Sequence, residues 1–101
     1  MAETVEFRSN GGVASGYHAV PPAGSGPGVL VIQEWWGLDS GIKEMADRLA
    51  AAGFVALAPD LYHGKTTTSP DEAGRLLMEV DVERAGKEIA AAGAYLLARP
   101  E

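Results

Sequence analysis

The chain has 101 residues, of which 47% are hydrophobic and 22% charged, and these values exclude a disordered tail and allow one small domain, residues 1–101. Fourteen acidic against eight basic residues give a net charge of −6, which disfavours nucleic acid and anionic membrane surfaces as partners. Because the chain contains no cysteine, it can form no disulfide, thiolate metal site or cysteine nucleophile within these residues.

Two strands joined by a tight turn are expected at the amino terminus. Apolar and polar residues alternate from Thr4 to Arg8, and strand-like character resumes from Val13 to Val20. Asn10-Gly11 between them indicates a β-hairpin, because both residue types tolerate positive φ angles. The segment from Pro21 to Pro27 then predicts a loop, since it can continue neither a strand nor a helix.

An apolar strand and an amphipathic helix are predicted next. Val29 to Ile32 is an unbroken β-branched and apolar run, which indicates a strand buried on both faces. Asp39 or Ser40 can cap the helix, and Gly53 can end it. The residues expected to face the core at helical spacing are Ile42, Met45, Ala46, Leu49 and Ala50.

A second buried strand follows this helix directly. It is predicted for Phe54 to Ala58 and is stopped by Pro59. Strand, helix and strand within about 30 residues form a βαβ unit with its two strands parallel.

Two further helices are expected in the rest of the chain. Ser69-Pro70-Asp71-Glu72 is a capping box with proline at the first helical position, and the helix it starts should bury Ala73, Leu76, Leu77 and Val80. A second helix is predicted to begin at Asp81 and to be ended by Pro100. Its residues expected to face inward are Val82, Ala85, Ile89, Ala92 and Leu96.

Polar and aromatic residues stand where the first buried strand ends. Gln33, Glu34, Trp35 and Trp36 occupy this place, and the carboxyl ends of strands in open α/β sheets are where ligands bind. A carboxylate beside two indole rings should be partly desolvated, which suits Glu34 to proton transfer. Alternatively, Glu34 is structural and pairs with an arginine or with backbone amides. The residues alone leave both interpretations open.

The two histidines have different expected places. His63 follows the second buried strand and is a candidate for substrate contact, whereas His18 is expected on the surface of the hairpin. They are far apart in sequence and lack further ligands at metal spacing, so we expect no metal site. Gly12-Val-Ala-Ser15-Gly16 lacks the spacing of a nucleophile elbow, and the glycines from Gly24 to Gly28 precede a strand instead of following one, so neither indicates a site.

Four segments, in their order and spacing, resemble the amino-terminal part of the dienelactone hydrolase family. They are Val5-Glu-Phe-Arg-Ser-Asn-Gly-Gly, Tyr17-His-Ala-Val-Pro-Pro, Gly28-Val-Leu-Val-Ile-Gln-Glu-Trp-Trp-Gly-Leu and Ala58-Pro-Asp-Leu-Tyr-His-Gly. The resemblance implies the amino-terminal half of an α/β-hydrolase fold, in which a β-hairpin, a βαβ unit and further helices form around a mostly parallel sheet. It also implies hydrolysis of a small carboxylic ester or lactone by nucleophilic catalysis, without a cofactor.

The same resemblance assigns roles to individual residues. Glu34 matches the family's glutamate that helps to deprotonate the nucleophile, usually a cysteine. Trp35 matches the residue whose backbone N–H joins the oxyanion hole, a donor worth roughly 3 kcal/mol. Trp36 would form a wall of the pocket, and His63 stays a candidate for substrate binding. The family's arginine for a substrate carboxylate does not transfer, because Arg75 is out of register.

The chain ends at Glu101, where the nucleophile strand begins in that family. The nucleophile and its Asp and His partners should therefore lie beyond this residue, and we expect a fragment of a longer hydrolase. The alternative is a non-catalytic α/β module that pairs with a partner chain. A nucleotide-binding half-domain is disfavoured, because no glycine-rich strand-to-helix turn is present. The downstream reading frame distinguishes the first two, since a strand followed by G-x-C-x-G or G-x-S-x-G identifies a hydrolase.

Two expectations concern the environment of the chain. In the resembled fold Val29 to Ile32 lies beside the nucleophile strand, so in this chain one side of its backbone should be unpaired. That edge carries no charge or proline, and it predicts self-association. The amino terminus has neither a basic nor an apolar leader region, and no window approaches the ~18 apolar residues of a membrane span, so a cytoplasmic location is the default.

Overall fold

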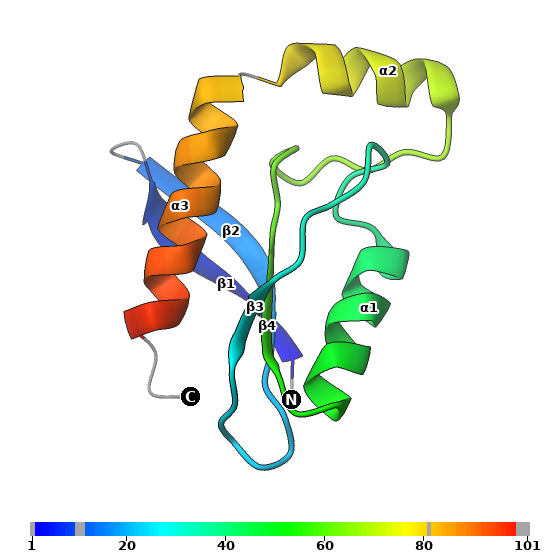
Figure 1. Cartoon of the computed structure of the whole chain (residues 1–101). Helices are drawn as coiled ribbons and strands as arrows, with labels where there is room; N and C mark the ends of the chain where they lie inside the picture. The colour runs from blue at the N-terminus through cyan, green and yellow to red at the C-terminus, as the bar shows by residue number, and fades with distance from the viewer. Residues whose placement is uncertain (1, 10–11, 81, 99–101) are drawn as a thin grey trace.

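The computed structural model describes residues 2–9, 12–80 and 82–98. Its elements in chain order are β1 (Ala2–Ser9), β2 (Gly12–Ala19), β3 (Gly28–Leu30), α1 (Ser40–Ala51), β4 (Val55–Pro59), α2 (Pro70–Glu79) and α3 (Val82–Ala98) (Figure 1). Every predicted strand and helix is present in the predicted order. The prediction that Pro59 stops the second buried strand is wrong by one residue, because Pro59 is the last residue of β4.

One four-stranded sheet, with the order β1-β2-β4-β3, forms the centre of the molecule. β1 and β2 form the predicted hairpin, with Ser9 opposite Gly12, and the predicted turn residues Asn10-Gly11 lie outside the described residues. β3 and β4 are parallel, as the βαβ prediction required, but β2 pairs with β4 antiparallel. The described sheet is therefore mixed, because the hairpin occupies the side of β4 opposite β3.

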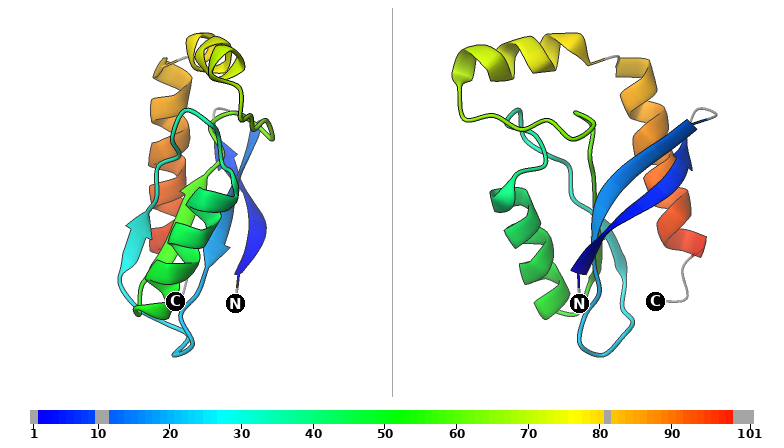
Figure 2. Two further views of the ribbon diagram at one scale, coloured as in Figure 1. Left: turned by 90° about the vertical axis from the view of Figure 1, so that its right-hand side faces the viewer. Right: turned by 180° about the vertical axis from the view of Figure 1, so that it is seen from behind.

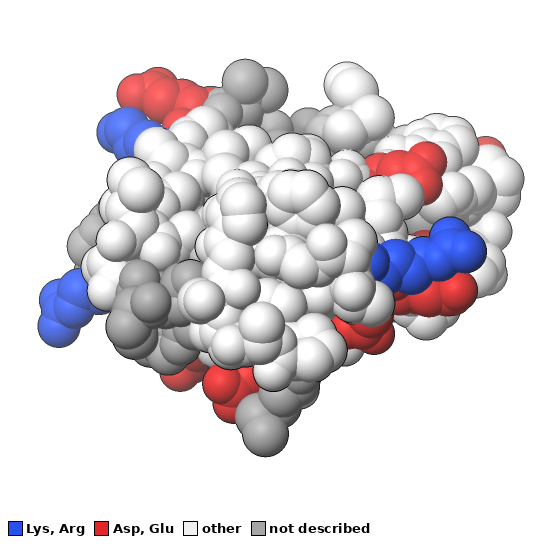
Figure 3. Space-filling model, turned by 60° about the horizontal axis from the view of Figure 1, so that its bottom comes forward, with Lys and Arg blue, Asp and Glu red and all other residues white. Residues whose placement is uncertain are grey.

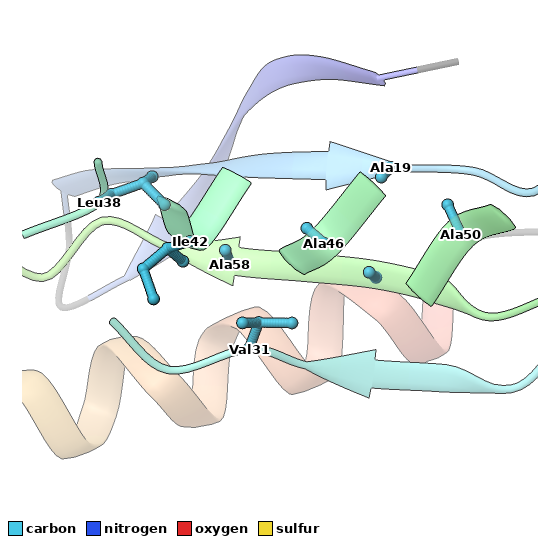
Figure 4. Packing of buried hydrophobic residues seen from close by; sticks show 8 residues of the cluster. Ala19, Val31, Leu38, Ile42, Ala46, Ala50 and Ala58 are labelled. Carbon is cyan, nitrogen blue, oxygen red and sulfur yellow. The ribbon is translucent and has the colours of Figure 1, made fainter. Parts of the chain in front are cut away.

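The helices α1 and α3 cover opposite faces of the sheet (Figures 1 and 2). The core below α1 consists mainly of small side chains, which let the helix approach the strands closely (Figure 4). Its buried members are Ala19, Val31, Leu38, Ile42, Ala46, Ala50, Ala56 and Ala58. On the other face, Phe7, Ala14 and Leu57 pack against Ala92 of α3. β4 is buried along its whole length, as predicted, but it begins at Val55, and Phe54, predicted as its first residue, is half-buried.

Both predicted cap residues, Asp39 and Ser69, are confirmed, but the reciprocal bond of the predicted capping box is not formed, because the Ser69 amide donates to Oγ1 of Thr67. The amide of Ile42 donates to Oδ1 of Asp39 over 3.1 Å, and the amide of Glu72 donates to Oγ of Ser69 over 3.4 Å. Gly53 follows α1 with a φ of +103°, a conformation that favours glycine. The start of α3 was predicted at Asp81, which lies outside the described residues.

Two apolar residues expected to face the core are on the surface. Met45 is 51% exposed because only the i, i+4 row of Ile42, Ala46 and Ala50 on α1 is fully buried. Leu77 is 52% exposed because α2 lies beyond the end of the sheet, where Ala73 and Leu76 are its buried residues (Figure 1).

The strand predicted for Val29 to Ile32 is shorter and less buried than expected. β3 ends at Leu30, although the Val31 amide still donates to the Leu57 carbonyl over 2.9 Å. Val29 and Leu30 are half-buried, and Ile32 is 47% exposed. The prediction of burial on both faces is wrong, because β3 is an edge strand of the described sheet with a neighbour on one side.

Candidate functional site

Two loops meet at the carboxyl ends of the parallel strands β3 and β4, the place that the sequence predicted for a site. The amide of Leu61 donates to the side-chain Oε1 of Gln33 over 2.8 Å. The amide of Thr67 donates to the carbonyl of Trp36 over 3.1 Å. These bonds join residues 31–39, which follow β3, to residues 60–69, which follow β4 (Figure 1).

Gly37 allows the close approach of the two loops. It has a φ of +96°, and a Cβ atom placed on it would lie 2.5 Å from the carbonyl oxygen of Lys65 and 3.2 Å from the ring of Tyr62. Any side chain there would both strain the backbone and push the loops apart. The glycine that ends the Gln-Glu-Trp-Trp-Gly segment is therefore required by the geometry of the site.

Glu34, Trp35 and Trp36 form a tight turn at the end of the β3 loop. The turn is closed by the amide of Gly37, which donates to the carbonyl of Glu34 over 3.1 Å. The ring centroids of Trp35 and Trp36 lie 5.1 Å apart, and the angle between the two ring planes is 58°. Within the described residues, the backbone bonds outside helices and strands include none from the Trp35 amide. In a turn closed between its first and fourth residues, the amide of the second residue makes no bond within the turn, so the Trp35 amide can donate to an external acceptor.

The carboxylate of Glu34 is exposed in this chain. The expected partial desolvation is therefore wrong for the chain as it stands, because the turn lies at the edge of the sheet where β3 has a neighbour on one side. The ion pairs found among the described residues do not include Glu34. An open carboxylate beside an available amide can act on a group that approaches from outside the described chain.

The loop after β4 is held by the carboxylate of Asp60. Its two oxygens accept hydrogen bonds from the amide of Tyr62 over 3.2 Å and from the amide of Gly64 over 2.7 Å. The amide of Asp60 in turn donates to the carbonyl of Ser15 over 2.8 Å. His63 has a φ of +55° and Gly64 one of +92°, and the Asp60 bonds stabilise this left-handed pair.

His63 faces α3 and lies apart from the turn that contains the two tryptophans. Its Nε2 atom lies 3.0 Å from Oε2 of Glu88, a residue that is 4% exposed. Both residues line a hollow of about 220 Å³ between this loop, α2 and α3, and Glu34, Trp35 and Trp36 are not among its lining residues. The structure thus brings Glu34, Trp35 and Trp36 together and places His63 in a neighbouring hollow.

Three structural features were missed or misjudged from the sequence. His18, expected on the surface, is 2% exposed, because α3 covers the hairpin and places Tyr95 edge-on to it at 5.8 Å. Glu88 was assigned no role, although it lies three residues after Ala85 and four before Ala92, a spacing that places it on the sheet-facing side of α3. The hydrogen bond between the Leu61 amide and Gln33 was not predicted either, although Gln33 was already noted as a polar residue directly after a buried strand.

Tyr62 is a further buried polar residue at this end of the sheet. The residue is 7% exposed, and burial raises the pKa of its phenol. Within the described part of the chain, its hydroxyl has no hydrogen-bond partner. Residues 2–9, 12–80 and 82–98 contain no group of three or more side chains that could hold a metal ion, and no helix long and apolar enough to cross a membrane.

Comparisons with known proteins give a consistent result. The model of the dienelactone hydrolase family matches residues 14–101. The Protein usf of Aquifex pyrophilus is 51% identical over 90 residues, which are 86% of this chain and 38% of that protein. The carboxymethylenebutenolidase of Pseudomonas sp. strain P51 is 42% identical over 67 residues, which are 63% of this chain and 28% of that protein.

A solved structure shows the same architecture. The crystal structure of a dienelactone hydrolase-like promiscuous phosphotriesterase from metagenomic libraries superimposes with a TM-score of 0.82 and 30% sequence identity. The match covers 100% of this chain and 44% of that one. The chain therefore spans less than half the length of the relatives that it matches.

Proposed function

Because the chain belongs to the dienelactone hydrolase family, we propose that it is the amino-terminal portion of a carboxylic ester or lactone hydrolase that acts by nucleophilic catalysis. The nucleophile and its Asp and His partners then lie beyond residue 101. The substrate is a small ester or lactone, and no cofactor takes part. The share of the relatives' length that the chain spans supports the assignment to one portion of a longer enzyme.

The single observation that carries this proposal is that hydrogen bonds join the two loops at the carboxyl ends of β3 and β4. The Gln33 and Trp36 bonds fix the backbone of the turn that contains Glu34 and Trp35 relative to the β4 loop. A preorganised amide donor stabilises an oxyanion only if its position is set before the reaction. The bonds between the loops provide that preorganisation within this chain.

The proposed roles follow from this arrangement. The nucleophilic thiol or hydroxyl transfers its proton toward Glu34 as its sulfur or oxygen attacks the substrate carbonyl. The negative charge that develops on the carbonyl oxygen accepts a hydrogen bond from the Trp35 amide. Trp36 walls the substrate pocket. For His63 to contact substrate, this pocket has to extend to the neighbouring hollow that His63 shares with Glu88.

The proposal is tested by restoring the missing part of the enzyme. Residues 1–101 are fused to the carboxyl-terminal remainder of the Aquifex pyrophilus relative, and hydrolysis of p-nitrophenyl acetate and of a simple lactone is measured. We expect the fusion to turn over at least one of them. Glu34→Gln in the fusion should lower kcat by a typical general-base factor of about 10² to 10⁴ while the fold stays intact.

The matched control is Glu44→Gln, which makes the same change at an exposed glutamate on α1. A folded fusion that hydrolyses neither substrate would contradict the proposed activity. A fusion whose Glu34→Gln variant keeps activity within about twofold of the parent would assign Glu34 to structure.

A further inference from the structure

Charged side chains are placed differently at the two ends of the sheet. Figure 3 views the molecule from the end at which β3 begins, where charged side chains lie at the rim and the described side chains in the middle are uncharged. At the opposite end, the loops after β3 and β4 carry the carboxylates of Glu34 and Asp60. Glu34 is exposed, whereas Asp60 is half-buried and bonded to its own loop. The proposed reaction uses the first carboxylate and assigns no part to the second.

Asp60 joins the sheet to the loop that follows β4. Its amide donates to the carbonyl of Ser15 in β2 over 2.8 Å, so the start of the loop is held against the sheet. Its two carboxylate oxygens accept the amide of Tyr62 over 3.2 Å and the amide of Gly64 over 2.7 Å. Because side-chain bonds to amides a few residues ahead impose a turn, this one carboxylate fixes the course of the backbone from Asp60 to Gly64.

The loop that Asp60 shapes contacts the loop after β3 at two places. The amide of Leu61, which lies inside the Asp60 turn, donates to Oε1 of Gln33 over 2.8 Å. Farther along, the carbonyl oxygen of Lys65 lies 2.5 Å from the position that a Cβ atom on Gly37 would take. Both contacts depend on the direction of the backbone after β4, and therefore on the bonds that Asp60 accepts.

These two contacts stand on either side of the Trp35 amide. The turn between Gln33 and Gly37 is short, and the Gly37 amide closes it by donating to the Glu34 carbonyl over 3.1 Å. A shift of the β4 loop would therefore carry the Trp35 amide with it. A donor stabilises an oxyanion only when its position is set beforehand, and a misplacement of about 1 Å can cost about 10²-fold in rate.

We propose that Asp60 is a positioning residue of the reaction, which sets the place of the Trp35 amide through the bond between Leu61 and Gln33 and does not touch substrate. This role requires an acid, because two backbone amides need two acceptor atoms. A carboxylate supplies two oxygens, whereas asparagine would turn its NH₂ group toward one of the amides. The inference rests on the proposed function, since it deepens the role of the Trp35 amide as the oxyanion donor.

The fusion of residues 1–101 with the remainder of the Aquifex pyrophilus relative tests this role. Asp60→Asn should lower kcat about 10- to 100-fold and leave KM within about twofold, because the oxyanion forms only in the transition state. The pH profile of kcat/KM should keep its shape, because Asp60 exchanges no proton with substrate. Asp71→Asn is the matched control, since it makes the same change at an exposed aspartate in the first turn of α2 and should keep kcat within about twofold of the parent.

A second variant tests the path of the effect from the other loop. Gln33→Met removes the acceptor of the Leu61 amide at a similar side-chain length and should reproduce the loss of kcat at unchanged KM. When position 33 is already Met, Asp60→Asn should lower kcat by less than about a further threefold, since both changes break the same connection. Gln33→Met also tests this connection if Asp60→Asn prevents the fusion from folding.

The outcomes distinguish this role of Asp60 from the proposed function. A folded parent fusion without activity contradicts the proposed function and the role of Asp60 with it. An active parent leaves the proposed function in place, and the role of Asp60 is then overturned by either of two results. One is that the folded Asp60→Asn or Gln33→Met variant keeps kcat within about twofold of the parent, and the other is that the two losses of kcat multiply in the double variant.

Discussion

The Nε2 atom of His63 lies 3.0 Å from Oε2 of Glu88, and this contact joins the loop after β4 to the middle of α3. The two residues are 25 positions apart in the chain. The carboxylate is almost fully buried, while the imidazole is 43% exposed. The histidine thus supplies a partner to a buried acidic group and anchors the loop that packs against the Glu34 turn.

Removing the histidine should destabilise the chain. His63→Asn keeps a residue type that tolerates the left-handed backbone but shortens the side chain, so Glu88 loses its partner at a cost of about 1–3 kcal/mol. Glu88→Ala should cost much less when position 63 is already Asn, which denaturant unfolding of the double-mutant cycle will show. The control is the exposed ion pair of Glu72 and Arg75, in which Nη2 of Arg75 lies 3.3 Å from Oε2 of Glu72. Arg75→Ala should change the free energy of unfolding by about 0.5 kcal/mol or less. Additive costs at positions 63 and 88 would mean that the two side chains are not coupled.

Gly37→Ala should be one of the most damaging single-methyl changes in the chain. The added Cβ would lie 2.5 Å from the Lys65 carbonyl on a backbone with a φ of +96°, so we expect a loss of about 1–3 kcal/mol. Gly74→Ala is the matched control, since this glycine lies inside α2 with open space around it and should gain about 0.5–1 kcal/mol. Thermal unfolding of both variants measures the contrast, and equal stabilities would show that the loops can separate at Gly37 without cost.

Stability should decline at alkaline pH because of Tyr17. The hydrogen bond that its hydroxyl donates to Asp47 over 2.8 Å raises the pKa of Tyr17 above its ordinary value of 10.0, with burial and the Asp47 charge acting in the same direction. The folded chain therefore holds the phenol proton more tightly than the unfolded chain does. This contribution is fully present below pH 10.0 and is lost as pH rises through the raised pKa.

A phenolate absorbance titration and unfolding curves at several alkaline pH values measure this effect. Burial raises the pKa of Tyr62 as well, so part of the decline should persist in every Tyr17 variant. Asp47→Asn removes the acceptor's charge and should return the Tyr17 titration toward 10.0. Because the amide oxygen of asparagine can still accept the hydrogen bond, an unchanged titration in Asp47→Asn would show that the charge of Asp47 does not contribute to the shift.

The 101-residue chain by itself should not hydrolyse esters above background. It contains no cysteine, and the groups proposed to form and resolve an acyl-enzyme lie beyond it. The measurement is the release of p-nitrophenol from p-nitrophenyl acetate with increasing amounts of pure chain. A rate of hydrolysis that rises in proportion to the concentration of the chain and is lost in the Glu34→Ala variant would instead show that Glu34 acts alone as a base.

Local patterns in the sequence determined the elements and the meeting of the two loops that follow β3 and β4. The caps at Asp39 and Ser69 and the positive-φ glycine after α1 are decided by residues within a turn of each other, so their signals are visible without a structure. The parallel pair of β3 and β4 follows from the spacing of strand, helix and strand. The meeting of the Gln33–Gly37 and Asp60–Gly64 segments follows in turn, since parallel strands end at one edge.

Only the tertiary structure decided how deeply individual side chains are buried and what they contact. His18 is buried and Glu88 has a partner because α3 returns over the hairpin and the β4 loop, which no local pattern near either residue encodes. Glu34 and Ile32 are exposed because β3 is an edge of the described sheet, although the strand itself is as apolar as a central one. Periodicity reports which residues share a face, whereas burial depends on which distant segment covers that face.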